Sequence, residues 1–224
     1  MTDTRLQRLN MVESQVRPSD VTDRRIIKAM LEVPREAFVP HALAPIAYMD
    51  EAITVSAKSN GAGGVRQLLA PRTLAKLIQL AQVGDQSAVL DVGCATGYST
   101  AILAMIAKRA VAVEADKDLA AAAVRALQKL GLANAMVVHG PLTEGAPAEA
   151  PFDAIILNGA VEVIPPSLTE QLKDGGRLVA VVVQGPLSRA QVTLRSGKGF
   201  DTRPAFEAPA ALLPGFQVPA GFVF

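Results

Sequence analysis

The chain has 224 residues, of which 50% are hydrophobic and 19% are charged, with a formal net charge of +1. This length and composition are typical of a packed globular protein and argue against a disordered one. The near-neutral charge and the 4% of aromatic residues argue against nucleic-acid binding, so we expect no nucleic-acid partner.

Two observations bear on location. The chain has a single cysteine and so forms no internal disulfide, which favours an intracellular protein. Its first fifteen residues are polar and of mixed charge, unlike a secretory signal, and no uncharged apolar stretch reaches about eighteen residues. We therefore expect a cytoplasmic protein with no membrane partner.

The first part of the chain is predicted to be helical. Residues 19–31 carry cap-type residues followed by apolar residues at helical spacing, and Pro34 is expected to end this helix. Residues 51–66 include serine, asparagine and several glycines close together, which predicts a flexible loop. A further helix is expected over 71–81, which opens on a proline suited to a first helical turn.

From residue 88 onward, apolar strands and helices alternate. The predicted order is a strand at 88–92, a helix at 98–108, a strand at 110–114, a helix at 117–130, strands at 135–139 and 152–158, a short helix after Pro166 and a strand at 175–183. Continuous apolar strands separated by helices predict an α/β fold with a parallel sheet covered on both faces. The alternating residues 189–196, followed by a turn, predict an antiparallel hairpin at the sheet edge.

A glycine-spaced loop follows the first of these strands. The stretch "VLDVGCATGYST" places Gly93 and Gly97 at the carboxyl end of the strand, where open α/β sheets bind ligands. Glycine permits positive φ and lets a ligand come within contact distance of the backbone. Glu114 ends the second strand, and a carboxylate there can accept hydrogen bonds from both hydroxyls of a ribose. The loop and the acid together predict a nucleoside site.

The spacing of the loop argues against the common nucleotides. A dinucleotide fingerprint, G-x-G-x-x-G, would need glycine where the chain has Ala95 and Tyr98, and no P-loop motif occurs. S-adenosylmethionine (SAM) is an adenosine with an amino-acid tail and no phosphate, so it needs a glycine loop for the tail and an acid for the ribose. We therefore predict SAM as the cofactor. The alternative for the loop is a tight strand-to-helix turn that binds nothing.

Several segments resemble the SAM-dependent protein-L-isoaspartate O-methyltransferase family. They are "DVGCATGYSTAILA", "AVAVE", "LGLANAMVVHG", "PFDAIILNGAVEVIPPSLTEQLKDGGRLVAVV", "MVESQVRPSDVTDRRIIKAMLEVPREAFVP" and "AYMDE", and the resemblance covers residues 9–58 and 70–184. It implies a Rossmann-like class I methyltransferase with a mostly parallel seven-stranded sheet. Residues 1–70 would form a helical N-terminal segment with a substrate-side loop, and 71–224 the SAM-binding domain, in one compact unit. The implied activity is methylation of the α-carboxyl of isoaspartyl residues in damaged proteins or peptides.

The resemblance also implies which residues contact the cofactor. By position they are Asp91, Gly93, Cys94, Ala95, Gly97, Glu114, Ala115, Gly140, Pro141 and Asn158. The loop residues would line the methionine part, Glu114 would hold the ribose, Ala115 would flank the adenine, and Asn158 would lie near the methyl-transfer centre. Pro141 stands where the family ordinarily has an aspartate for the adenine amino group, so that bond would fall to nearby backbone.

Some of these residues have a simpler interpretation. Asp91 either contacts SAM or fixes the glycine loop. Cys94 has no basic partner that the sequence identifies, so we interpret it as a small filler and not as a nucleophile. His139 either touches the adenine or merely ends its strand. The two histidines and the one cysteine lie too far apart in the sequence to predict a metal site.

The substrate side departs from the family pattern. The family's Gly-Gln-Thr-Ile-Ser-x-Pro run aligns with "VRQLLAP", so that Gln67 replaces a threonine and Leu69 replaces a serine. Asp50 matches the family's aspartate before this run, although capping of a turn explains it equally well. The departures leave open a SAM-dependent methyltransferase with another acceptor and a non-catalytic SAM-binding relative as alternatives to the isoaspartyl enzyme.

Overall fold

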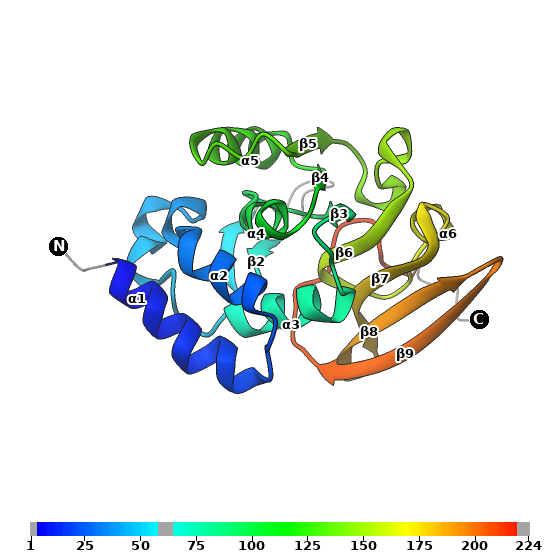
Figure 1. Ribbon diagram of the computed structural model, residues 1–224, viewed down its shortest axis with the longest axis horizontal. Coiled ribbons are helices and arrows are strands. Elements are labelled where there is room, and N and C mark those ends of the chain that lie inside the picture. Colours follow the sequence, from blue (N-terminus) through cyan, green and yellow to red (C-terminus); the bar gives the residue numbers. More distant parts are fainter. Residues whose placement is uncertain (1–3, 58–64, 219–224) are drawn as a thin grey trace, which may run out of the picture.

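The computed structural model describes residues 4–57 and 65–218, and its centre is a mostly parallel sheet (Figure 1). Among these residues the sheet has seven strands in the order β5-β4-β3-β6-β7-β8-β9. The strands are β3 Ala88–Val92, β4 Arg109–Glu114, β5 Ala135–His139, β6 Phe152–Val161, β7 Leu172–Gln184, β8 Leu187–Ser196 and β9 Gly199–Glu207. Strands β3 to β7 pair in parallel, and β8 and β9 add an antiparallel hairpin. The predicted α/β fold and the edge hairpin are confirmed.

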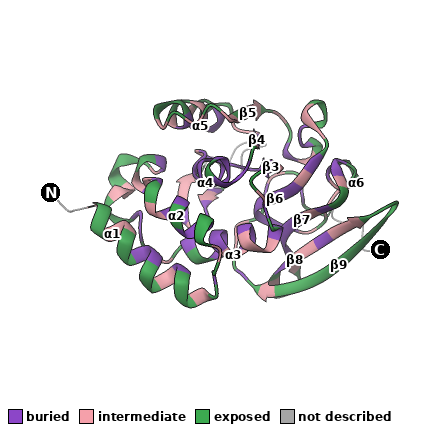
Figure 2. Ribbon diagram, viewed as in Figure 1, coloured by how far each residue is buried: buried purple, intermediate pink, exposed green. Residues whose placement is uncertain are grey.

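Alternate side chains of the strands pack into two separate hydrophobic cores. One core joins Val89 and its neighbours to α3 Pro71–Ala81, α4 Tyr98–Ile106 and α5 Lys117–Lys129. The other joins Leu90 to α6 Pro166–Thr169 and to the C-terminal segment. Figure 2 shows buried residues concentrated in α4 and the central strands, whereas β9 is exposed. A sheet buried on both faces explains why its central strands are apolar throughout.

The N-terminal segment is helical, as predicted. It contains α1 Thr4–Met11, a π-helical turn Val12–Val16, a 3-10 turn Arg17–Ser19, α2 Arg24–Glu32, and 3-10 turns Arg35–Phe38 and His41–Ile46. Asp23 caps α2 by accepting a hydrogen bond from the Arg25 N–H. The helix ends at Glu32 because the residue before Pro34, Val33, is extended. Within the described ranges, no helix has both the length and the apolar character of a membrane span.

A short hairpin lies where the sequence predicts only a loop. Strand β1 Ile53–Ser56 pairs antiparallel with β2 Arg66–Leu68, so the loop prediction for 51–66 is wrong at both ends. Each strand is too short to show a clear alternation by itself, and the two strands that pair are separated in the sequence. The glycine-rich part of the predicted loop, 58–64, lies outside the described residues.

The segment after β9 returns to the middle of the sheet. Ala160 of β6 donates its N–H to the Ala211 carbonyl and accepts from the Leu213 N–H, both at 2.8 Å. Leu213 and Phe216 are buried in the second core. In Figure 1 this red segment runs back from β9 toward β6, close to the carboxyl end of β3. The end of the described chain is therefore part of the site region.

Candidate functional site

Three residues in the loop after β3 have a left-handed backbone conformation. Gly93, Ala95 and Gly97 have φ values of 77°, 51° and 94°. The Gly93 N–H donates to the Val113 carbonyl at 2.8 Å, which ties the loop to the end of β4. Positive φ at a non-glycine residue costs free energy and often marks a functional site, and here it aims the Ala95 N–H at a carboxylate.

Gly97 is required by packing as well as by its backbone angle. A Cβ added there would lie 3.0 Å from the Ala123 Cβ of α5. The second glycine of the loop therefore lets α5 approach the start of α4, a structural role that does not depend on a ligand.

The carboxylate that the Ala95 N–H meets belongs to Glu114, at the end of β4. Glu114 Oε2 accepts from the Ala95 N–H at 2.7 Å and from Arg66 Nη2 at 2.8 Å. Its Oε1 accepts from the Ala115 and Asp116 N–H groups at 2.9 and 3.2 Å. Four donors from the described part of the chain thus surround one fully buried carboxylate.

Asp91 lies in β3, just before the loop, and is also fully buried. Its side chain accepts from Ser99 Oγ at 2.8 Å, Thr100 Oγ1 at 2.5 Å and Asn158 Nδ2. Burial raises the pKa of Asp91 to about 6, although these three hydrogen bonds oppose the shift. Asp91 therefore joins the start of α4 to β6, and it holds the predicted site residue Asn158 in place.

Two side chains from distant parts of the chain lie against this loop. A Cβ added to Gly93 would be 2.9 Å from Arg66 Nη2 and 3.0 Å from Leu213 Cδ2, and one added to Gly159 would be 2.6 Å from Leu213. The space that the glycines leave open is filled by Arg66 of β2 and by the C-terminal Leu213. Neither residue was predicted, because no local pattern signals a contact between segments so far apart.

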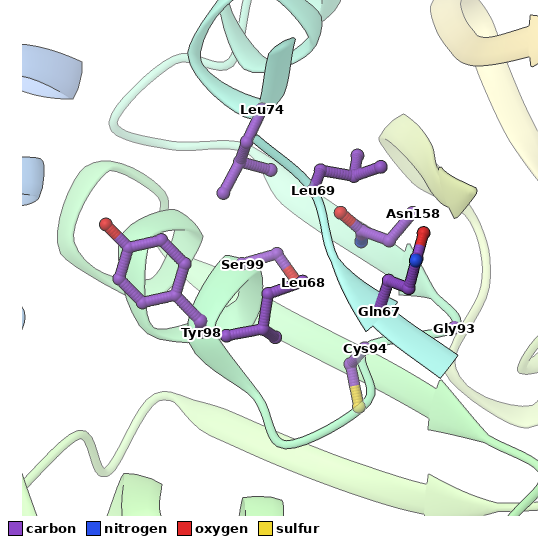
Figure 3. Close-up of a pocket in the computed structure, with 9 residues that line it drawn as sticks. All are labelled: Gln67, Leu68, Leu69, Leu74, Gly93, Cys94, Tyr98, Ser99 and Asn158. Atoms are coloured by element: carbon purple, nitrogen blue, oxygen red, sulfur yellow. The ribbon is translucent and has the colours of Figure 1, made fainter. Parts of the chain in front are cut away.

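The cavity that remains beside the loop is about 10 Å³. Figure 3 shows its lining from β2, the start of α3, the loop, α4 and β6: Gln67, Leu68, Leu69, Leu74, Gly93, Cys94, Tyr98, Ser99 and Asn158. A volume of this size holds about one water molecule, whereas a ligand of SAM's size needs several hundred Å³.

Two of the three predicted substrate-side residues, Asp50 and Gln67, line a larger cavity of about 480 Å³, whereas Leu69 lines only the small one. Gln67 lines both cavities, and its Nε2 donates to Thr54 Oγ1 at 3.1 Å. Asp50 also lines the larger cavity, 3.2 Å from Arg72 Nη1, and burial raises its pKa. Gln67 is therefore the predicted residue that separates the buried loop from the open cavity.

Leu69 is buried and holds its place through its backbone. Arg35, itself fully buried, donates from Nη2 to the Leu69 carbonyl and from Nε to the Ala47 carbonyl, both at 2.8 Å. One guanidinium thus fixes the chain before β1 and after β2. Sequence reasoning missed Arg35, which begins a short 3-10 turn next to Glu36, and no local pattern indicates that it is buried.

The remaining predicted residues are divided between the interior and the surface. Cys94 is buried, and burial raises the pKa of its thiol well above its usual range, which agrees with its interpretation as a filler. Gly140 donates its N–H to the Glu114 carbonyl at 3.1 Å, next to the exposed Pro141. His139 lies 3.2 Å from the Ala115 carbonyl through Nε2. The structure therefore brings Ala115, His139, Gly140 and Pro141 together beside Glu114 at one edge of the site.

Comparison with known proteins identifies the family. The profile of the protein-L-isoaspartate(D-aspartate) O-methyltransferase family matches residues 7–204. The chain belongs to this family. It is 40% identical to the protein-L-isoaspartate O-methyltransferase of Geobacter metallireducens over 177 residues, 79% of each chain. It is 36% identical to protein-L-isoaspartate O-methyltransferase 2 of Shewanella sediminis over 196 residues, 88% of this chain and 77% of the relative.

Solved structures of the family have the same fold. A protein-L-isoaspartate O-methyltransferase structure superposes with a TM-score of 0.81 at 23% identity, over 93% of this chain and 66% of the other. A putative protein-L-isoaspartate O-methyltransferase of Plasmodium falciparum, in complex with S-adenosyl-L-homocysteine, gives 0.75 at 19% identity, over 95% and 99%. The predictions of family, methyltransferase class and Rossmann-like fold are confirmed.

This methyltransferase is SAM-dependent, as is its family, and its residues fit SAM in kind. A glycine backbone that admits close approach lies beside a carboxylate at the end of the second parallel strand. In the present conformation the glycine loop and Glu114 leave no room for SAM, because Arg66 occupies an acceptor position of Glu114 and Leu213 covers Gly93. A ligand of SAM's size would fit beside this loop only after these side chains had moved.

Proposed function

We propose that the protein transfers a methyl group from SAM to the α-carboxylate of isoaspartyl residues in damaged proteins or peptides. The observation that carries this proposal is the position of Glu114 beside the glycine loop, with Gln67 separating that loop from an open cavity. The family and the sequence identity to named relatives support the same acceptor. A cytoplasmic location is part of the proposal and is supported by the single cysteine.

In this proposal the cofactor lies along the carboxyl ends of β3 and β4. Glu114 holds the ribose, and Ala115, Gly140 and Pro141 border the adenine. The other predicted cofactor residues surround the amino-acid tail, namely Asp91, Gly93, Cys94, Ala95, Gly97 and Asn158. Asp91 acts mainly through Asn158 and the start of α4, because its oxygens already accept three hydrogen bonds.

The reaction itself places few demands on the protein. Bound SAM supplies a methyl group on a positive sulfur. An isoaspartyl α-carboxyl has a pKa of about 3.5, so it is already ionised near neutral pH and needs no general base. What the chain has to do is remove water from the carboxylate and hold it in line with the methyl. We assign these tasks to Gln67 and Asn158, whose amides border the small cavity.

The substrate-side substitutions change how the acceptor is held. A neutral hydroxyl that orients a carboxylate contributes about 1.5–3 kcal/mol, or about one to two decades in rate, so its loss at Leu69 slows the reaction without abolishing it. Gln67 can offer an amide N–H in its neighbourhood, because its Nε2 has two N–H donors and gives one of them to Thr54 Oγ1. The acceptor peptide would approach through the 480 Å³ cavity between Asp50, Arg72 and residues 209–211.

The test is a methylation assay with two matched peptides. The protein is incubated with labelled SAM and either an isoaspartyl peptide or its ordinary aspartyl twin, and base-labile methyl ester is counted. The proposal expects ester on the isoaspartyl peptide alone. S-adenosylhomocysteine (SAH) binding without ester on the isoaspartyl peptide, or on a D-aspartyl analogue, would refute the acceptor and keep the cofactor.

A second candidate function keeps SAM and changes the acceptor. It is favoured by one observation, the apolar Leu69 buried where the family has a serine. Methylation of a cell extract distinguishes the two: label that survives mild base indicates an acceptor other than a carboxylate.

A further inference from the structure

Arg66 and Glu114 form a buried ion pair inside the proposed cofactor site. The two residues are 1% and 0% exposed, and Arg66 Nη2 lies 2.8 Å from Glu114 Oε2. The guanidinium lies on the backbone of Gly93, where the absent Cβ gives a ligand its access. One side chain thus blocks both the acid and the glycine of the predicted nucleoside site.

Of the four donors around Glu114, only Arg66 is replaceable. The other three are N–H groups of Ala95, Ala115 and Asp116, which belong to the loop and to the end of β4. A ribose hydroxyl can reach Glu114 Oε2 only by taking the place of the guanidinium. Arg66 and the cofactor therefore exclude one another.

Arg66 lies in a short hairpin, which Arg35 holds at the residues before β1 and after β2. Strand β2 has three residues and pairs only with the four-residue β1, and a pair of this size is marginal without support. The register shifts between Thr54 and Ser56, next to the partner of Arg66. Arg66 Nε is buried and has no hydrogen-bond partner within the described ranges, which leaves the closed position incompletely satisfied.

We propose that Arg66 is an internal competitor of the cofactor: it closes the nucleoside site by pairing with Glu114 and leaves when SAM or SAH binds. This inference rests on the proposed function, because it takes Glu114 as the ribose acceptor. The apparent affinity for the cofactor is then the intrinsic affinity multiplied by the fraction of molecules with Arg66 displaced.

Calorimetric titration with SAH tests the proposal without any measurement of activity. Arg66→Gln removes the charge and restores the residue that the family has at this place, and we expect it to bind SAH at least about tenfold more tightly than the unmodified protein. Arg189→Gln is the matched control, since Arg189 pairs with Glu207 on the exposed hairpin. It should leave the dissociation constant unchanged.

The outcomes separate the two proposals. Equal or weaker SAH binding by a folded Arg66→Gln protein overturns the role of Arg66 and leaves the proposed function standing. Absence of binding by both proteins at millimolar SAH overturns both. A crystal structure of the unmodified protein with SAH covers the case in which Arg66→Gln does not fold: ribose hydroxyls on Glu114 with Arg66 displaced support the proposal, and Arg66 still on Glu114 beside bound SAH overturns it.

Discussion

Arg66 and Glu114 are 48 residues apart in the sequence, yet their side chains meet at 2.8 Å in the interior. This contact joins the β1–β2 hairpin to the end of β4, so that the substrate side and the cofactor side share one ion pair. The two partners differ in what would remain if either were removed. Glu114 accepts hydrogen bonds from three backbone N–H groups besides Arg66. Among the described residues, the Arg66 guanidinium donates only to Glu114.

The two halves of this pair should therefore differ in their contribution to stability. Glu114→Gln leaves a buried arginine without a counter-charge and should lower the free energy of unfolding by about 3–5 kcal/mol. Arg66→Gln leaves a carboxylate with three hydrogen bonds and should lower it by only about 1–2 kcal/mol. Urea denaturation of both variants measures the difference, and an equal loss would contradict this asymmetry.

Asp91 should make the stability of the fold depend on pH. Its pKa is raised by burial from 3.8 to about 6, so between these values the folded state binds a proton that the unfolded state has lost. The stability contribution of the protonated carboxyl is complete below about pH 4 and is lost as pH rises through about 6, a change of about 3 kcal/mol. Asp91→Asn should remove this dependence. Unfolding curves of both proteins across this range give the comparison, and parallel pH profiles would count against the shift.

Cys94 should be nearly inert in the folded protein. Its thiol is buried and its pKa is raised, so thiolate is scarce and access is blocked. We expect reaction with a disulfide reagent to be at least about 100-fold slower in buffer than in denaturant. Because the chain has one cysteine, the signal reports this site alone. Rapid labelling of the native protein would show that the glycine loop opens readily.

Gly97 should tolerate a side chain less well than Gly131. Both have positive φ, 94° and 70°, but an added Cβ at Gly97 meets Ala123 at 3.0 Å and one at Gly131 meets nothing within 4 Å. Gly131→Ala should lower stability by about 1 kcal/mol through the backbone alone, and Gly97→Ala by about 2–4 kcal/mol. Thermal unfolding of the two variants measures the excess due to packing. Equal losses would assign the effect to the backbone angle only.

The parts of the site that sequence reasoning placed correctly are local in the chain. Gly93 and Gly97 follow a strand that alternation with helices had already located, and Glu114 ends the next strand, so the rule for open sheets brings them together. The predicted helix at 117–130 and strand at 88–92 differ from the structure by one residue at most. The division of the chain at residue 70 stays a prediction, as do the ligand contacts of the site residues.

The parts that were missed depend on contacts across the fold. Arg66 was not singled out from the segment "VRQLLAP", and nothing in its neighbours indicates that it would lie on Glu114. Arg35 is an ordinary charged residue in the sequence, and its burial follows from two carbonyls that come from either side of the hairpin. Leu213 stood in a proline-rich tail with no periodicity, and its place is set by hydrogen bonds to Ala160. Burial and pairing of this kind result from packing between segments that are distant in the sequence. The periodicity of apolar residues does not indicate such packing.

The contact of Leu213 with Gly93 and Gly159 has a practical consequence for anyone who handles this protein. A protease that cuts the chain between β9 and Leu213 would release the side chain that lies against the glycine loop after β3. Cut and intact preparations should then differ in how readily they take up SAM.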